Sequence, residues 1–348
     1  MEEKIKKRFF VLVLITVVIA VLSGSFVLVN AISYNAEDIV SFGLYPQTKV
    51  TDEDLIKQLD KQSLSWKSYG YYSGNDIDGD GEGDVGTMVQ GDYMKYADFT
   101  YSFQKFRAVK FTEYRPFRPF NITSSTATNN FQKQNGYNVN TVYYFKYEPL
   151  KWRIIDKEKK LLLCEQIIDN QPFNNTVYEY GADDYYFFAF WSDESYKFYA
   201  NNYEKSSLRQ WLNNDFYNLS FNDDEKASLL TREIDNSAYS KEREEYSSNN
   251  TFDKVSLLSY KDANNKRYGF TSIEKLAANG TDYAKCQGLR VYEFNMNSNY
   301  RLTTASFNSL QNCAVTCEGY VAHTTKDDKS FDGIRPLIQI SDYKNVNR

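Results

Sequence analysis

Residues 141–169, TVYYFKYEPLKWRIIDKEKKLLLCEQIID, carry the clearest strand pattern of the chain. TVYYFKY and LKWRIID alternate between apolar and polar residues, as strands with one buried face do. We therefore expect two strands here, separated by Glu148-Pro149, because proline cannot donate to a sheet. The charged segment DKEKK predicts a turn, and the apolar LLLCEQII predicts a strand that enters the core.

The flanking segments add short strands and a few capped helices. Upstream, DIVSFGLY predicts a strand that ends at Pro46, and Thr51-Asp52 predicts a helix start. Downstream, helical spacing marks SSLRQWLNNDFY, and a capping box opens a helix at Asn222. IEKLAANGTDYAKC predicts a helix broken at Gly280. The remaining strand candidates are KVSLLSY, YRLTT, CAVTCEG and GIRPLIQI. Short strands without a strand–helix–strand rhythm predict the α+β class.

The first residues have the layout of a secretory signal. Four basic residues precede an unbroken apolar run at 9–22, and Val29-Asn30-Ala31 offers small or apolar residues at a cleavage position. Counted to residue 29, the apolar stretch is also about long enough to span a bilayer. We expect residues 1–31 to be either a signal peptide or, through residues 9–29, a membrane anchor. Both predict an extracellular or cell-surface protein whose only membrane contact is this segment.

The rest of the chain divides by regularity. Residues 115–136 are rich in Asn, Thr and Ser, and regular strands begin only beyond them. We therefore predict an N-terminal extension over residues 32–148, which includes an acidic Gly-rich loop, and a regular domain over residues 149–342.

Charge and histidine content exclude several classes of function. The net charge is −5, and the first eight residues carry a surplus of positive charge, so the remainder is more acidic still. Because nucleic-acid binding needs a clustered basic face, we expect no nucleic-acid partner. His323 is the only histidine, so a Ser-His-Asp triad or a histidine-ligated zinc would have to use it. Its polar surroundings, VAHTTKDDKS, predict a solvated surface residue.

Four cysteines permit two disulfides in an exported protein, with three possible pairings. Cys164 follows an apolar run and is expected to be buried. If their stretch is a strand, Cys313 and Cys317 stand about 13 Å apart, too far to bond to each other, whereas in a helical turn they could pair or share a metal. For Cys164, Cys286, Cys313 and Cys317 we expect partners elsewhere or free thiols, and the sequence does not choose the pairing.

The acidic loop NDIDGDGEGDVG (75–86) is the candidate metal site. Asp76, Asp78, Asp80 and Asp84 occupy positions 1, 3, 5 and 9 of a calcium-loop pattern with Gly81 at position 6. Thr87 stands where an EF-hand needs glutamate, so this is no EF-hand. The loop is either a looser, stabilising calcium loop or a solvated acidic spacer.

Aromatic residues offer a second kind of site. The chain has 30 Tyr, 24 Phe and 4 Trp, and tyrosine suits half-wet surfaces that stack on sugars or partner proteins. The candidates are Trp66, Tyr69, Tyr71 and Tyr72, and the run from Tyr185 to Trp191. The alternative for Trp66, Trp152 and Trp211 is the core. Arg335, between Ile334 and Pro336, either clamps a carboxylate ligand or pins a loop by internal hydrogen bonds.

A family resemblance accompanies these patterns. KWRIID, LLLCEQIID, SSLRQWLNNDFY, VSLLS and GIRP, over roughly residues 148–340, resemble an uncharacterised family of exported domains common in gut Firmicutes. FGLYPQ, DYMKYADF, KFRAVKF and YRPF are similar to the extension that some members carry. That family resembles the C-type-lectin-like fold, including the formylglycine-generating enzymes, which end in a similar G-F-R strand. Residues 300–304, YRLTT, depart from the W-L-R-S strand usual in the family.

The resemblance and the residues together lead to one expectation and two alternatives. We expect an exported surface protein that recognises a glycan, a peptide or an extracellular protein without catalysis, with calcium as a possible ligand of the acidic loop. An enzyme of the formylglycine-generating type is the first alternative, with Cys313 and Cys317 as a copper-type pair. A purely structural cell-surface domain is the second. No pair of carboxylates is marked out for glycosidase chemistry.

Overall fold

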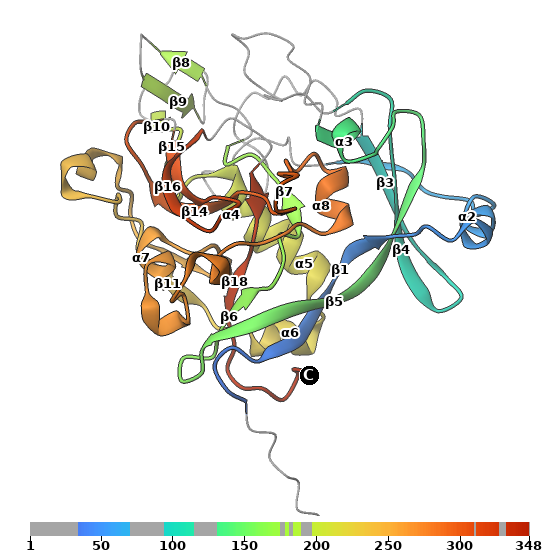
Figure 1. The fold of residues 1–348 in the computed structure, drawn as a ribbon, viewed down its shortest axis with the longest axis horizontal. Helices are drawn as coiled ribbons and strands as arrows, with labels where there is room; N and C mark the ends of the chain where they lie inside the picture. The colour runs from blue at the N-terminus through green and yellow to red at the C-terminus, as the bar shows by residue number, and fades with distance from the viewer. Residues whose placement is uncertain are drawn as a thin grey trace, which may run out of the picture. The chain divides into compact units, whose positions relative to one another are not determined.

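Strand β5, Tyr143–Asp156, is the central strand of the larger sheet and runs without interruption through Pro149. The prediction of two strands separated by Glu148-Pro149 is therefore wrong. Along one edge, β4 (Gln104–Phe111) pairs with residues 143–146 and β6 (Leu161–Cys164) pairs only from Trp152 onward. Pro149 lies in the gap between these partners, where its missing N–H interrupts neither ladder. Figure 1 shows β1 (Ile39–Lys49), in blue, beside the green β5 on its other edge.

The computed structural model describes a large part of the 348-residue chain: residues 34–69, 94–114, 131–174, 178–180, 184–188, 197–309, 311–326 and 332–347. The chain divides into two units, residues 1–35 and 36–348. Every helix and strand described below belongs to the second unit.

The larger sheet has eight strands and is antiparallel. Its order is β13-β18-β6-β5-β4-β3-β2, with β1 paired to β5 outside this path. The strands other than β5 are β1 (Ile39–Lys49), β2 (Lys67–Ser68), β3 (Met94–Tyr101), β4 (Gln104–Phe111), β6 (Leu161–Cys164), β13 (Val255–Ser256) and β18 (Leu337–Gln339). The boundary expected at residue 148 falls inside β5, so segments from both sides of it share this sheet.

A second sheet of five strands has the order β16-β15-β14-β17-β7. These strands are β7 (Asp169–Asn170), β14 (Tyr300–Ala305), β15 (Gln311–Val315), β16 (Val321–Lys326) and β17 (Gly333–Ile334). Only β14 and β17 are parallel. The described residues also form two small sheets. One consists of β8 (Tyr178–Tyr180), β9 (Asp184–Phe188) and β10 (Lys197–Tyr199), and the other of β11 (Arg232–Ile234) and β12 (Thr251–Asp253).

The predicted strand GIRPLIQI is divided between the two sheets at Arg335-Pro336, since β17 belongs to one sheet and β18 to the other. Arg335 is buried, and its guanidinium donates to the carbonyls of Cys164 (2.7 Å) and Leu276 (2.9 Å). Arg335 therefore pins the crossover by internal hydrogen bonds, which was one of its two predicted roles.

The helices are short and their caps match local sequence signals. They are α2 (Glu53–Leu59), α3 (Phe131–Gln134), α4 (Ser207–Trp211), α5 (Tyr217–Ser220), α6 (Asp223–Ser228), α7 (Tyr260–Ala263) and α8 (Asp282–Cys286). A π-helical turn η2 (Leu212–Phe216) joins α4 to α5, and the 3₁₀ turns are η3 (Lys241–Tyr246), η4 (Lys266–Tyr268) and η5 (Ile273–Lys275). Asn222 and Glu225 form the predicted capping box of α6. Strands and short helices together confirm the α+β class.

The predicted broken helix over residues 273–286 consists of two separate pieces, η5 and α8. Gly280 lies between them, where a side chain would collide with Leu289. Among the helices of the described residues, none combines the length and apolar character that crossing a bilayer requires. The apolar residues 9–29 lie outside the described part.

Candidate ligand-binding pocket

A cavity of about 440 Å³ lies between strands β1, β3 and β4 and the helical stretch α4–η2–α5. In Figure 1, α5 and α8 lie next to β1, and both contribute to the cavity walls. The volume is within the range usual for small-molecule pockets. The lining residues are Tyr45, Lys67, Tyr69, Tyr96, Asp98, Arg107, Asp169, Gln171, Trp211, Asn214, Asp215, Phe216, Asn218, Leu219 and Tyr283.

Arg107 is the central charged residue of the pocket wall. It is buried on β4 and donates two hydrogen bonds to Asp98 of β3, at 2.8 and 2.7 Å. Its guanidinium also lies 4.4 Å from the ring centre of Tyr96. Desolvation alone would raise the pKa of Asp98, but the hydrogen bonds and charge of Arg107 outweigh it and lower that pKa. The two charges therefore form a stable, bidentate pair.

Tyrosine hydroxyls extend this network. Arg107 Nη1 donates to the hydroxyl of Tyr283 (3.0 Å), which lies 3.0 Å from the hydroxyl of Tyr69. Gln287 Nε2 donates to Tyr69 at 3.0 Å. Desolvation by burial raises the pKa of both tyrosines. They therefore stay neutral and can act as donors and acceptors.

Asp169 is a buried carboxylate at the start of β7. Its Oδ2 accepts from the hydroxyl of Tyr45 at 2.5 Å, and its Oδ1 accepts from the backbone N–H of Asn170 at 2.6 Å. Burial, followed by the charge of Asp169, raises the pKa of Tyr45. The tyrosine therefore stays protonated, and its hydroxyl donates a hydrogen bond to the carboxylate.

The helical wall carries the exposed polar side chains. A π-helical turn inserts an extra residue into a helix and is frequent at functional sites. Here η2 presents Asn214 and Asp215 to the cavity, while Phe216 stacks on Trp211 with ring centres 5.6 Å apart. Asp215 is exposed to water, but it lies in a hollow, and the reduced hydration raises the pKa of its carboxyl.

Two lining charges have no ion-pair or hydrogen-bonding side-chain partner within the described residues. They are Lys67, on the edge strand β2, and Asp215, on the opposite helical wall. Arg107 is paired with Asp98, and Asp169 accepts from neutral donors. The pocket therefore offers both an uncommitted cation and an uncommitted anion.

The predicted metal site cannot be compared with this pocket, because Asp76, Asp78, Asp80 and Asp84 lie outside the described residues. Within the part of the chain that is described, no group of three or more His, Cys, Asp or Glu side chains is placed to hold a metal ion.

The predicted aromatic platform is dispersed. Tyr69 lines the pocket, whereas Trp66 packs on a small core cluster with Lys110 Nζ 4.0 Å from its ring centre. Trp152 is fully buried, and Trp211 is both nearly buried and part of the pocket wall. Tyr71 and Tyr72 lie outside the described residues. Of the run 185–191, β9 includes residues 185–188, and the remainder is outside the described part.

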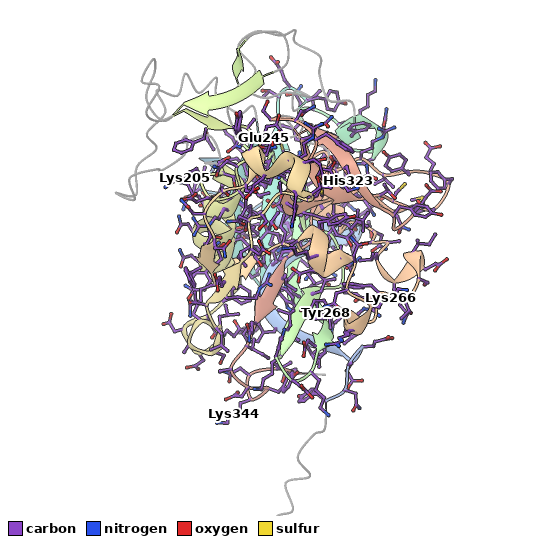
Figure 2. The ribbon with its side chains drawn as sticks, turned by 90° about the vertical axis from the view of Figure 1, so that its left-hand side faces the viewer. Lys205, Glu245, Lys266, Tyr268, His323 and Lys344 are labelled. Atoms are coloured by element: carbon purple, nitrogen blue, oxygen red, sulfur yellow. The ribbon has the colours of Figure 1, made fainter. Side chains whose placement is uncertain are left out.

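The prediction that His323 is a solvated surface residue is wrong. Figure 2 labels His323 among the side chains around it. The residue lies on β16, and its ring centre is 4.5 Å from that of Tyr239 and 5.2 Å from that of Tyr260. Its Nδ1 lies 3.6 Å from Cys313 Sγ. Burial lowers the pKa of His323, so the ring is the neutral form at physiological pH.

All four cysteines lie in the described residues, where they are buried and free of disulfides. Cys313 belongs to β15, whereas Cys317 follows that strand and accepts from Asn295 Nδ2 through its backbone oxygen. Burial raises the pKa of Cys164 to about 12 and also raises that of Cys317. Both are therefore protonated at neutral pH, and a protonated thiol is a poor metal ligand.

Sequence reasoning missed most of the pocket. A carboxylate directly after the apolar run LLLCEQII marks Asp169, and a charge inside the strand KFRAVKF marks Arg107. Neither signal identifies its partner. Asp215 carries no signal, because the π-helical turn that presents it is not visible in the helical spacing.

The structure is that of an α+β protein with a polar cavity. The domain of unknown function DUF6273 matches residues 157–342, more than half of the chain, and the chain belongs to this family. The resemblance to an uncharacterised domain family is confirmed to that extent. No curated protein and no solved structure matches the chain. The matched range includes Asp169, η2 and α8, whereas Tyr45, Asp98 and Arg107 precede it.

Proposed function

We propose that this protein is a non-catalytic recognition protein whose pocket binds a saccharide. The observation that carries the proposal is the mixed lining of the pocket: tyrosine hydroxyls, amides, carboxylates and cations surround a cavity of about 440 Å³. Sugar hydroxyls both donate and accept, so they need such a mixture of partners.

The exposure of the lining residues supports a hydroxyl-rich ligand over an apolar one. Asn214, Asp215 and Asn218 are exposed on the helical wall, while Trp211 and Phe216 are mostly covered. A ligand would therefore meet polar groups first. The neutral tyrosines beneath them supply further hydrogen bonds in an environment with little competing water.

The same proposal includes the setting of the protein. We propose that residues 1–31 direct export or anchor the chain, that the fold is C-type-lectin-like, and that the loop with Asp76 and Asp78 binds calcium. The apolar run at 9–29 and the alternating carboxylates support the first and third statements. Mostly antiparallel sheets with short helices are compatible with the second.

The formylglycine-generating alternative receives less support from the described residues. That chemistry would use Cys313 and Cys317 as thiolates on one metal ion. The thiol of Cys313 instead faces His323, and burial keeps Cys317 protonated. A purely structural domain would leave the pocket without a ligand, which the binding experiment tests directly.

The experiment is a glycan-array screen of the full-length chain, followed by titration calorimetry with the best ligand. Asn214→Trp should fill the mouth of the pocket and abolish binding, because the larger side chain occupies the space of the ligand. Asn138→Trp, at an exposed asparagine that does not line the pocket, is the matched control and should bind normally.

Running the screen in millimolar calcium and again in EDTA separates the pocket from the acidic loop. Binding that persists in EDTA and is lost only in Asn214→Trp supports the pocket. Absence of saccharide binding under both conditions, or equal binding by the two tryptophan variants, would overturn the proposal.

A further inference from the structure

A second cavity, of about 460 Å³, is lined by residues of β1, β5, α8 and the loop that precedes α8. Among the described residues it shares none of its lining with the candidate pocket: on α8, for example, Tyr283 lines the pocket and Asp282 lines the second cavity. No aromatic side chain of the described residues lines this second cavity. It therefore offers a ligand hydrogen bonds and charges, but no ring on which to stack.

Gln47 gives the second cavity a buried amide with one free end. The residue is 8% exposed, and its Nε2 donates to the carbonyls of Glu148 (2.7 Å) and Pro149 (3.3 Å). These two acceptors fix the orientation of the amide, because only its NH₂ group can donate to them. Oε1, at the other end of the amide, accepts no hydrogen bond within the described residues and is not fully enclosed. A ligand in the cavity can therefore donate an N–H to it.

The main chain of Gly280 supplies a further donor and a further acceptor. Because glycine has no side chain, Gly280 lines the cavity with backbone atoms. The Asn279 carbonyl and the Thr281 N–H both bond to Ile167, each at 2.9 Å, whereas the N–H and C=O of Gly280 have no hydrogen-bond partner within the described residues. Together with Gln47 Oε1, these groups suit peptide bonds, which each contain one N–H and one C=O.

Strand β5 contributes one anion and one cation to the same cavity, and each is bonded to a hydroxyl. Glu148 Oε2 accepts from Thr48 Oγ1 at 2.6 Å, and Lys151 Nζ donates to Ser41 Oγ at 2.7 Å. Neither charge forms an ion pair with another described residue, whereas the other two charges of the lining pair with each other at 3.2 Å. A carboxylate and an ammonium each bind several partners, so both can also bind a ligand.

We propose that the second cavity binds a short peptide with free termini, whose ammonium group lies at Glu148 and whose carboxylate lies at Lys151. Residues 148 and 151 stand about 10 Å apart along β5, a length that an extended tripeptide matches. The peptide bonds between the termini are left to Gln47 Oε1 and to the main chain of Gly280. This site is separate from the candidate pocket, so the inference does not depend on the proposed saccharide binding.

The test is calorimetric titration of the full-length chain with trialanine, at about pH 6, where both termini of the peptide are charged. N-acetyl-trialanine and trialanine amide are the comparison ligands, because each lacks one of the two charges. Trialanine should bind about tenfold more tightly than either of them, the smaller effect expected for a hydrogen bond to a charged group.

Two substitutions test the assigned residues. Lys151→Gln should lower the affinity for trialanine about tenfold and leave the affinity for trialanine amide unchanged. Glu148→Gln should have the same effect, with N-acetyl-trialanine as the unaffected ligand. Retained binding of the unaffected ligand also shows that the variant is folded. Lys157→Gln, at an exposed lysine outside the cavity, is the matched control and should bind all three peptides as the native chain does.

The outcomes distinguish this inference from the proposed function. Absence of trialanine binding, equal binding of the three peptides, or identical binding by Lys151→Gln and Lys157→Gln would overturn the peptide site. Asn214→Trp fills the candidate pocket and should leave trialanine binding unchanged. Loss of trialanine binding in Asn214→Trp would place the peptide in the candidate pocket and overturn the second site. Peptide binding without any saccharide binding would support the second site and overturn only the proposed function.

Discussion

Arg107 and Arg335 are buried arginines that join segments far apart in the sequence. Arg107 connects β4 to Asp98 and to Tyr283 of α8, and Arg335 connects the crossover between the sheets to two backbone carbonyls. Burying a charge is unfavourable unless it is paired and hydrogen-bonded. Arg107 meets both conditions through its ion pair with Asp98, whereas Arg335 is compensated by hydrogen bonds to the Cys164 and Leu276 carbonyls and to the Tyr300 hydroxyl.

His323 gives a pH-dependent contribution to stability. Burial lowers its pKa in the folded state below the ordinary value of 6.5. The unfolded chain therefore takes up a proton at a higher pH than the folded chain does. The contribution of the neutral ring is complete above about pH 6.5 and is lost as the pH falls from there to the folded-state pKa. When the pH falls from 7 to 5, the free energy of unfolding of the His323→Phe variant should fall less than that of the native chain.

Urea denaturation at both pH values measures this difference. Because the chain has one histidine, its imidazole NMR signal also reports the pKa without assignment. A folded-state pKa at or above 6.5 would contradict the prediction. So would identical pH dependence in the two proteins.

At the scale of elements, the β3–β4 hairpin contains an unfavourable turn. Ser102 and Phe103 both have positive φ, 46° and 68°, between the paired residues Tyr101 and Gln104. A two-residue turn of this kind favours Asn-Gly, and a left-handed conformation costs other residues about 1 to 2 kcal/mol. Phe103 is also fully exposed, so its side chain gains no packing.

Replacing Ser102-Phe103 by Asn-Gly should therefore raise the free energy of unfolding by about 1 to 2 kcal/mol. Thermal or urea unfolding followed by circular dichroism measures the change. Phe103→Ala is the control: it removes the exposed ring but keeps a residue with a Cβ in the left-handed region, and it should change stability little. A stabilisation of equal size in the control would show that the ring, and not the backbone, is unfavourable.

Elements that depend on signals within a few residues could be predicted, whereas those that depend on neighbouring strands or on residues distant in the sequence could not. The capping box at Asn222 acts within one helical turn, so four residues identify it. Pro149 carries the same local signal as a strand end, but β4 and β6 pair on either side of it and leave it in a gap. His323 was placed in a loop because its aromatic neighbours come from distant segments.

For the whole molecule, the candidate pocket depends on how the two larger sheets and the helical segments pack together. Tyr45, Arg107, Asp169 and Asp215 come from four segments, and more than 100 residues separate Tyr45 from Asp169. Periodicity gives the face of a strand but not the strand that will lie beside it. The class of fold could therefore be predicted from the sequence, and the constellation of the pocket could not.

A fragment that begins at the predicted domain boundary and contains the matched family range, residues 157–342, should not fold as the full protein does. A chain of residues 149–348 would lose β1 to β4 and the first six residues of β5, and Trp152 would lose its hydrogen bond to the carbonyl of Phe42 at 2.6 Å. We expect this fragment to lack a cooperative thermal transition. A chain that begins at residue 34 keeps every described strand and should melt cooperatively. A cooperative transition in the fragment would instead place a domain boundary inside β5.

The four buried thiols make it possible to follow local unfolding of this chain by their reactivity. Cys164 lies in the eight-stranded sheet, Cys313 in the five-stranded sheet and Cys286 in α8. A thiol-alkylating reagent reaches each of them only when its own surroundings open. Mass spectrometry of the alkylated peptides over time therefore gives separate opening rates for the two sheets and for α8. The native cysteines thus serve as probes of local unfolding, and no cysteine has to be introduced by mutation.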